Sequence, residues 1–186
     1  MDRRFQDMGS RIRGRLTEGM TRRRTEVLSV VLLAATVCMG MMAGLFAAFS
    51  YSVMPGLARA DDRTLVITMQ RINEAILNPL FGLLFVGALA FTAIAVVLAA
   101  RAGDRAPLPW LIAALVLYVA TLAITFGGNI PLNNLIAGAG DPDRLTELAA
   151  LRERFEGAWV RWNIVRTVTS TAGFAALSWV ALIAGR

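Results

Sequence analysis

Four long stretches of the chain contain no charged residue. They cover residues 27–58, 75–100, 106–140 and 167–185. About 20 helical residues cross a hydrocarbon core about 30 Å thick, so each stretch is long enough to span a membrane. The pattern predicts an all-α integral membrane protein, a bundle of four transmembrane helices over about residues 27–53, 75–100, 108–126 and 160–184.

Glycine and proline residues mark the expected helix ends, because both interrupt helices. The sequence MPG at residues 54–56 is expected to end the first helix. The third uncharged run is too long for one helix, and GGNIP at residues 127–131 is expected to end it. Asn78-Pro79 is expected to kink the second helix where it enters the membrane.

Two polar segments join the helices on the side opposite the N-terminus. The first begins with Asp61 or Asp62 as the N-cap of a helix that leads into the second span. The second contains Asp141-Pro142, an N-cap followed by proline in the first helical position. It predicts a short surface helix over residues 142–155, interrupted at Gly157.

A pair of small residues in the first span, Gly40 and Gly44, forms a GxxxG pattern. Small residues at this spacing let two helices approach closely. The pattern favours packing inside the four-helix bundle, and the alternative is a seam between two copies of the chain.

The composition agrees with a membrane protein. Of the 186 residues, 56% are hydrophobic, and the mean hydropathy is +0.59. All 19 basic residues are arginine, which together with the alanine content suggests a GC-rich bacterial gene and therefore a multi-pass protein of the bacterial plasma membrane. Eight arginines and only three acidic residues lie in residues 1–24. By the positive-inside rule this basic juxtamembrane segment is cytoplasmic, and four spans over residues 25–186 return the C-terminus to the same side.

The basic segment also carries an apolar stripe of Phe5, Met8, Ile12 and Leu16. A basic amphipathic segment beside a span is typical of one that lies on anionic lipid, and we favour this over a nucleic-acid tail. A further alternative is an export signal cleaved after Ala60, although the apolar run is longer than such signals usually have.

The residue types exclude some site chemistries. The chain has no histidine, which is the commonest metal ligand and general base. Its one cysteine, Cys38, lies in the first span beside Met39, Met41 and Met42. Those sulfur atoms could bind Cu(I), but methionine more often fills gaps between helices. We expect neither a metal site nor a cofactor.

Polar residues gather at the outer ends of the predicted spans, a costly position unless they face protein or water. Trp159, Trp162, Asn163 and Arg166 share one face of a helix because they lie at i, i+3, i+4 and i+7. The other segments place further residues at the same end: Asn73, Glu74, Asn78, Asn129, Asn133 and Asn134. The cluster is either a binding site or a set of helix caps and interfacial anchors.

Four motifs that contain these residues carry a resemblance to a known family. AGLFAAFSYSVMPGL, MQRINEAILNPLF, GNIPLNNLI and WVRWNIVRT, in this order, are similar to the anthrone oxygenases, a family of small four-helix membrane proteins. The resemblance covers about residues 30–184. It implies the oxidation of an anthrone to an anthraquinone by O₂ without a recognised metal or flavin.

Such a reaction suggests roles for the clustered residues. Arg166 could stabilise an oxyanion with Asn163 as a neutral donor, Trp159 and Trp162 could stack on a polycyclic aromatic ligand, and Glu74 is the candidate base. The candidates for binding the ligand are Asn73, Asn78, Asn129, Asn133 and Asn134.

A non-catalytic membrane module is the second hypothesis. The same pocket would hold a lipid, the head group of a quinone or a small apolar solute. The expected partners are membrane lipid and a polycyclic aromatic or quinone-like small molecule, with no nucleic acid, and the oligomeric state is left open.

Overall fold

The computed structural model describes residues 2–103 and 105–184, with the side chains of residues 18–20, 22–103 and 105–183. Within these residues the fold is all-α and contains no strand. The helices in chain order are α1 (Asp2–Ala48), α2 (Met54–Leu57), α3 (Asp62–Ala75), α4 (Pro79–Ala102), α5 (Leu108–Ile124), α6 (Ile130–Ala137) and α7 (Leu148–Ala184), with two π turns, η1 (Phe49–Val53) and η2 (Thr125–Asn129), and one 3₁₀ turn, η3 (Pro142–Arg144).

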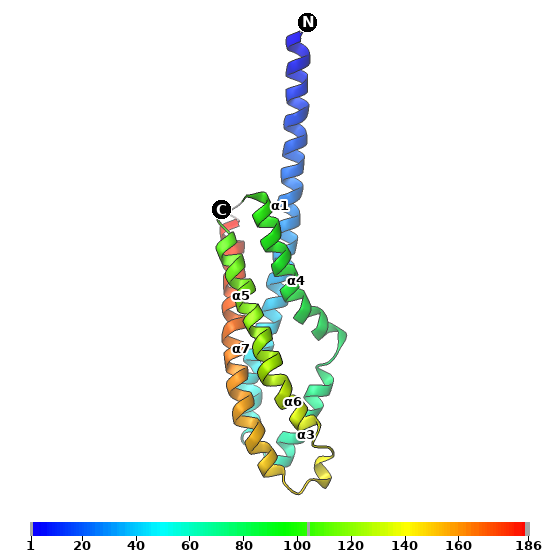
Figure 1. The fold of residues 1–186 in the computed structure, drawn as a ribbon, viewed down its shortest axis with the longest axis vertical. Helices are drawn as coiled ribbons and strands as arrows, with labels where there is room; N and C mark the ends of the chain where they lie inside the picture. Colours follow the sequence, from blue (N-terminus) through cyan, green and yellow to red (C-terminus); the bar gives the residue numbers. More distant parts are fainter. Residues whose placement is uncertain (1, 104, 185–186) are drawn as a thin grey trace.

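The long helices α1, α4, α5 and α7 pack side by side as one bundle, and α1 extends beyond it at the N-terminal end (Figure 1). The shorter helices α3 and α6 lie at the opposite end, beside the start of α7. The predicted lipid-facing stripe of residues 5, 8, 12 and 16 lies outside the described side chains.

Three helical segments within the described residues are long and apolar enough to cross a membrane. They are Glu18–Leu57, Pro79–Ala102 and Leu108–Ala137. Their outer faces are apolar too, since Val30, Leu83 and Val116 are each more than 60% exposed. Apolar surface this extensive marks a face that contacts lipid or protein rather than water.

The close approach between helices differs from the predicted GxxxG contact. A Cβ atom on Gly40 would lie 2.8 Å from the ring of Phe174 in α7, so this glycine does face another helix of the bundle. Gly44 is exposed, and a Cβ atom there would meet nothing within 4 Å. Four residues turn a helix by about 400°, so Gly44 is rotated about 40° away from the contact, and its predicted packing is wrong. The second close contact of α7 with α1 is made by Gly173, beside Met39.

Both helices that were expected to end near a proline continue through it. In η1 and in η2, the N–H of the residue after the turn bonds to the C=O five residues before it. The prolines, Pro55 and Pro131, follow directly. Proline lacks an N–H and clashes with the carbonyl four residues earlier, and a π turn accommodates this by widening the helix. The first helix ends at Leu57, within one residue of the end expected at residues 54–56. The expected end at residues 127–131 is wrong, because helical structure there continues to Ala137.

The second helix is broken rather than kinked. Asn78 caps α4: its Oδ1 accepts a hydrogen bond from the Phe81 amide (3.0 Å), and its Nδ2 donates one to the Ala75 carbonyl (2.9 Å). The span therefore starts at Pro79, not at residue 75.

The predicted surface helix over residues 142–155 does not form as a separate element. Only the 3₁₀ turn η3 follows Asp141, and α7 then runs without interruption through Gly157. One glycine costs a helix about 1 kcal/mol. Phe155 and Trp159, both buried, hold α7 in place on either side of it.

A second apolar cluster closes the end of the bundle where α3 and α6 lie. Its buried residues are Phe49, Met54, Leu65, Val66, Met69, Ile136, Phe155 and Trp159. Asp61 caps α3 as predicted and accepts a hydrogen bond from the Thr64 amide (2.8 Å), which lowers the pKa of its carboxyl. We call this cluster and the helices that form it the roof.

Candidate functional site

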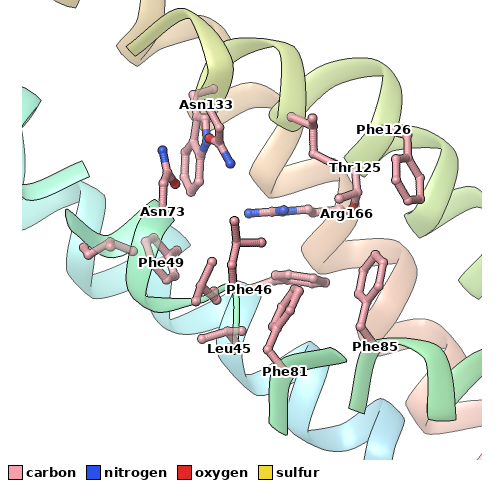
Figure 2. A pocket seen from close by; sticks show the side chains of 15 residues that line it. Leu45, Phe46, Phe49, Asn73, Phe81, Phe85, Thr125, Phe126, Asn133 and Arg166 are labelled. Atoms are coloured by element: carbon pink, nitrogen blue, oxygen red, sulfur yellow. The ribbon is translucent and has the colours of Figure 1, made fainter. Parts of the chain in front are cut away.

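A cavity of about 250 Å³ lies on the inner side of the roof, between α1, α3, α4, η2 and α7 (Figure 2). This volume is close to the lower end of the roughly 300–1,000 Å³ typical of small-molecule sites. Most of the lining is aromatic or aliphatic: Leu45, Phe46, Phe49, Ile72, Ile76, Leu77, Phe81, Phe85, Phe126, Ile130 and Trp159. The polar lining residues are Asn73, Thr125, Asn133 and Arg166.

Aromatic rings form one wall of the cavity. The rings of Phe81 and Phe85 are stacked with centroids 5.3 Å apart, and Phe126 meets Phe85 edge-on at 6.3 Å. Phe81 and Phe85 lie one turn apart at the start of α4, because residues at i and i+4 share a face. Flat rings of this kind offer a planar ligand both stacking and edge contacts.

The guanidinium of Arg166 lies at the centre of the cavity (Figure 2), and the residue is only 8% exposed. Its Cζ atom is 4.2 Å from the ring centroid of Phe46 and 5.2 Å from that of Trp159. Its Nε donates a hydrogen bond to Asn163 Oδ1 (2.8 Å). Among the residues that the structure describes, neither terminal nitrogen has a hydrogen-bond partner or a carboxylate beside it.

Asn163 fixes the position of Arg166. Its Nδ2 donates to the Phe46 carbonyl (3.1 Å) and to Ser50 Oγ (2.7 Å), so it joins α7 to the end of α1 and to η1. The Ser50 hydroxyl also lies 3.0 Å from that of Thr167. Asn163 is 1% exposed. Its amide therefore directs the arginine into the cavity and has no donor left for a ligand.

Two further amide groups line the cavity beside Arg166. Asn133 Oδ1 accepts a hydrogen bond from Trp159 Nε1 (2.7 Å), and the Nδ2 of Asn133 has no hydrogen-bond partner among the described residues. Asn73 Nδ2 is buried and has no partner among the described residues. Figure 2 shows both amides on the same side of the guanidinium. This end of the cavity thus presents N–H donors and no carboxylate, an arrangement suited to an oxygen atom that carries negative charge.

The structure brings together only part of the predicted site. Arg166, Trp159, Asn73 and Asn133 line the cavity, and two residues are buried behind them, Asn163 and Asn129. The Nδ2 of Asn129 donates to the Trp159 carbonyl (3.3 Å), while its Oδ1 has no partner among the described residues.

The other predicted residues lie outside the cavity. Glu74, Asn78 and Asn134 are exposed, and Asn78 serves as the cap of α4. Trp162 is 45% exposed and lies against the backbone of Gly128, so it does not line the cavity with Trp159. Trp162 lies three residues after Trp159, so the helix has turned about 300° between them. The Trp162 indole therefore lies at the edge of the helix face that carries Trp159.

Sequence reasoning missed the aromatic wall. Phe46, Phe81, Phe85 and Phe126 lie in apolar runs where any side chain can face either lipid or protein. Pro55 and Pro131 are the sequence signals nearest to this wall, but the π turns that precede them, a feature frequent at functional sites, are seen only in the structure.

Comparison with known proteins supplies one finding. A family model described as "Anthrone oxygenase" matches residues 80–176, just over half of the 186-residue chain. The match runs from the start of α4 into α7 and includes Phe81, Asn133, Trp159 and Arg166, but not Asn73 or α1. It is shorter than the expected range of residues 30–184. No curated protein and no solved structure matches the chain.

Proposed function

Because the chain belongs to the anthrone oxygenase family, we propose that it oxidises an anthrone-like or hydroquinone-like aromatic to a quinone with O₂. The observation that carries the proposal is the buried guanidinium of Arg166, which has no acidic partner among the described residues and points into an aromatic cavity. A buried charge is costly unless something pairs with it. The ligand that fits is a flat aromatic whose oxygen becomes negatively charged.

We propose that the chain has four spans, with both termini in the cytoplasm. Three segments meet the requirement for length and hydropathy. For α7, support comes from its position against α5 and α1 and from residues 167–184, which carry no charge and extend about 27 Å. Val168 and Leu182, each at least 60% exposed, give its outer face the same apolar character. The cavity then lies near the outer end of the bundle.

The proposed reaction balances without another reactant. The methylene carbon of an anthrone loses two hydrogens and gains one oxygen atom from O₂, and the second oxygen atom leaves as water. The ring system gives up four electrons and O₂ accepts four. The reaction starts when the methylene loses a proton to give an enolate, whose charge lies mainly on the oxygen and spreads through the rings.

The chain's part in this step is to stabilise the enolate. Arg166 would hold its oxygen with the terminal nitrogens, Asn73 and Asn133 would donate to the same oxygen, and the phenylalanine rings would hold the aromatic plane. Among the described residues no carboxylate lines the cavity, so we assign the departing proton to water rather than to Glu74. A fixed positive charge lowers the pKa of the bound ligand and favours this ionisation.

The test measures oxygen uptake and quinone formation by the protein in lipid nanodiscs supplied with anthrone. The rate above that of empty nanodiscs should fall to the background in Arg166→Lys, because lysine keeps the charge but not the planar fork. Arg161→Lys changes an exposed residue of the same helix and should retain the activity. Bound aromatic ligand without oxygen uptake in the wild type would instead support the non-catalytic binding module.

A further inference from the structure

We propose that the ligand enters and leaves the cavity sideways, directly from the lipid bilayer, through an opening between Leu77 and Phe126. The identity of the ligand rests on the proposed function, but the position of the opening does not. If the proposal holds, the substrates are lipid-soluble aromatics that partition into the membrane before they bind.

The roof closes the route from water. Its apolar side chains fill the end of the bundle, and Leu65, Val66 and Met69 of α3 are fully buried in it. Gln70 ties α3 to the loop after α6, because its Nε2 donates to the carbonyls of Ile136 (2.9 Å) and Gly140 (3.0 Å). A ligand that came from the aqueous side would have to displace this packing.

Arg152 fastens the other edge of the roof. Its guanidinium donates to the carbonyls of Ala58 (3.0 Å) and Ala60 (2.8 Å), to Asp62 Oδ1 (3.0 Å) and to Glu156 Oε2 (2.7 Å). These bonds join the start of α7 to the loop between α2 and α3. The roof is thus held on both sides by side chains that bond to backbone carbonyls.

The side of the cavity is open where the helical structure is interrupted between α3 and α4. Leu77 is 80% exposed and Phe126 is 60% exposed, whereas the other lining residues are buried or half-buried. Leu77 belongs to the connection before α4, which swings away from α6 in Figure 1. Leu80 and Leu83, on the same flank, are each 62% exposed. An opening bordered by exposed leucine and phenylalanine suits hydrocarbon better than water.

The opening lies at membrane depth if the long helices span the bilayer. The 24 residues of α4 extend about 36 Å, more than a hydrocarbon core of about 30 Å. Phe126 lies in η2, 18 residues or about 27 Å beyond Leu108 at the start of α5, which is within the thickness of the core. The Phe126 side of the opening therefore faces the acyl chains of one leaflet, and Leu77, just before α4, lies where these chains meet the head groups. A planar aromatic with one polar oxygen takes up this depth itself, with its oxygen toward the interface, and would reach Arg166 by moving sideways.

The first experiment locates the opening and does not depend on the ligand. Nitroxide labels on Leu77→Cys and Phe126→Cys, in a Cys38→Ala background in nanodiscs, should collide more with O₂ than with a water-soluble nickel complex. Leu83→Cys is the lipid-facing reference and Glu153→Cys the water-facing one, since both residues are exposed. Labels at 77 and 126 that behave like the label at 153 would overturn the proposal.

The second experiment tests the route with anthraquinone, whose binding is followed by quenching of tryptophan fluorescence. Leu77→Phe should slow both association and dissociation severalfold. The same change at Leu80, which is exposed but does not line the cavity, should have no effect. Arg152→Gln should not accelerate exchange. Faster exchange in Arg152→Gln with unchanged rates in Leu77→Phe would show that the route is aqueous. Absence of anthraquinone binding would count against the proposed function, and the labels alone would then decide on the opening.

Discussion

Replacing Arg166 by glutamine should separate the stability of the fold from its ability to bind a ligand. In the absence of ligand the guanidinium has one hydrogen bond, from Nε to Asn163, and the ring of Phe46 beside it. Burying the charged guanidinium has a desolvation cost. The hydrogen bond to Asn163 and the contact with the Phe46 ring offset it. We therefore expect Arg166→Gln to change the unfolding temperature little and to abolish the response to ligand.

The magnitudes of these effects are comparable. An arginine inside a membrane helix costs about 2.5–3.5 kcal/mol on insertion scales. A desolvated cation over an aromatic ring contributes about 2 kcal/mol, and a hydrogen bond from a charged group about 1.5–3 kcal/mol. Glutamine avoids the cost of burying a charge and can still donate to Asn163. The net change in the free energy of unfolding should stay within about 1 kcal/mol, or about 4 °C for a chain of this size.

The assay is thermal unfolding of the purified protein in detergent, with and without anthraquinone. For the wild type, a ligand at about 100 times its dissociation constant adds about 2.7 kcal/mol to the free energy of unfolding. The unfolding temperature of the wild type should therefore rise on addition of ligand, and that of Arg166→Gln should not. Arg161→Gln, an exposed change in the same helix, should behave as the wild type does.

A large loss of stability would refute this reasoning. Removing one partner of a buried ion pair costs about 3–5 kcal/mol, so a fall of more than about 10 °C without ligand would show that Arg166 is a structural residue with a partner of its own. A ligand-induced shift that survives in Arg166→Gln would show that the guanidinium does not contact the ligand.

Three further changes test other parts of the structure. Gly128→Ala would place a Cβ atom 2.6 Å from the indole of Trp162 and should destabilise the protein by about 1–3 kcal/mol, whereas a Cβ on Gly127 meets nothing within 4 Å and the same change there should lower the melting temperature less. Arg152→Lys loses the fork that bonds to several oxygens at once, so the melting temperature should fall although the charge is kept. Glu74→Gln should leave the pH profile of oxygen uptake unchanged because this exposed carboxyl does not line the cavity; loss of the fall in rate on the acidic side of the profile would restore Glu74 as the base.

The polar residues of the sequence pointed to the end of the bundle that holds the cavity, because polar residues are costly beside hydrocarbon and therefore conspicuous. It could not predict the rotation of each helix. Neighbouring residues on a helix point about 100° apart, so Asn73 faces the cavity while Glu74 faces outward. This angle depends on the break at Asn78, which the sequence indicated only as a kink, and on packing among helices that are apolar on every side.

The two π turns show a similar limit. A proline predicts a helix end, which is the usual outcome in water, where the carbonyl that loses its helical hydrogen bond can bond to solvent. Inside a membrane bundle that carbonyl needs a partner in the protein, and continuing the helix with a wider turn supplies one. Pro131 therefore marks a place where the helix widens next to the cavity rather than its end, whereas the helix that contains Pro55 ends two residues later, at Leu57.

The hydrogen bonds at the end of the bundle where α3 and α6 lie indicate why the ligand should bind there. Most polar side chains in this region bond to one another or to backbone, as Asn163 does with Phe46 and Ser50 and as Trp159 does with Asn133. These bonds can be explained by the fold alone. The groups left without partners among the described residues include the terminal nitrogens of Arg166 and the Nδ2 of Asn73, and both residues line the same cavity. A fold selected only for stability would satisfy these donors or replace them, so we infer that they are kept for an acceptor that the ligand brings.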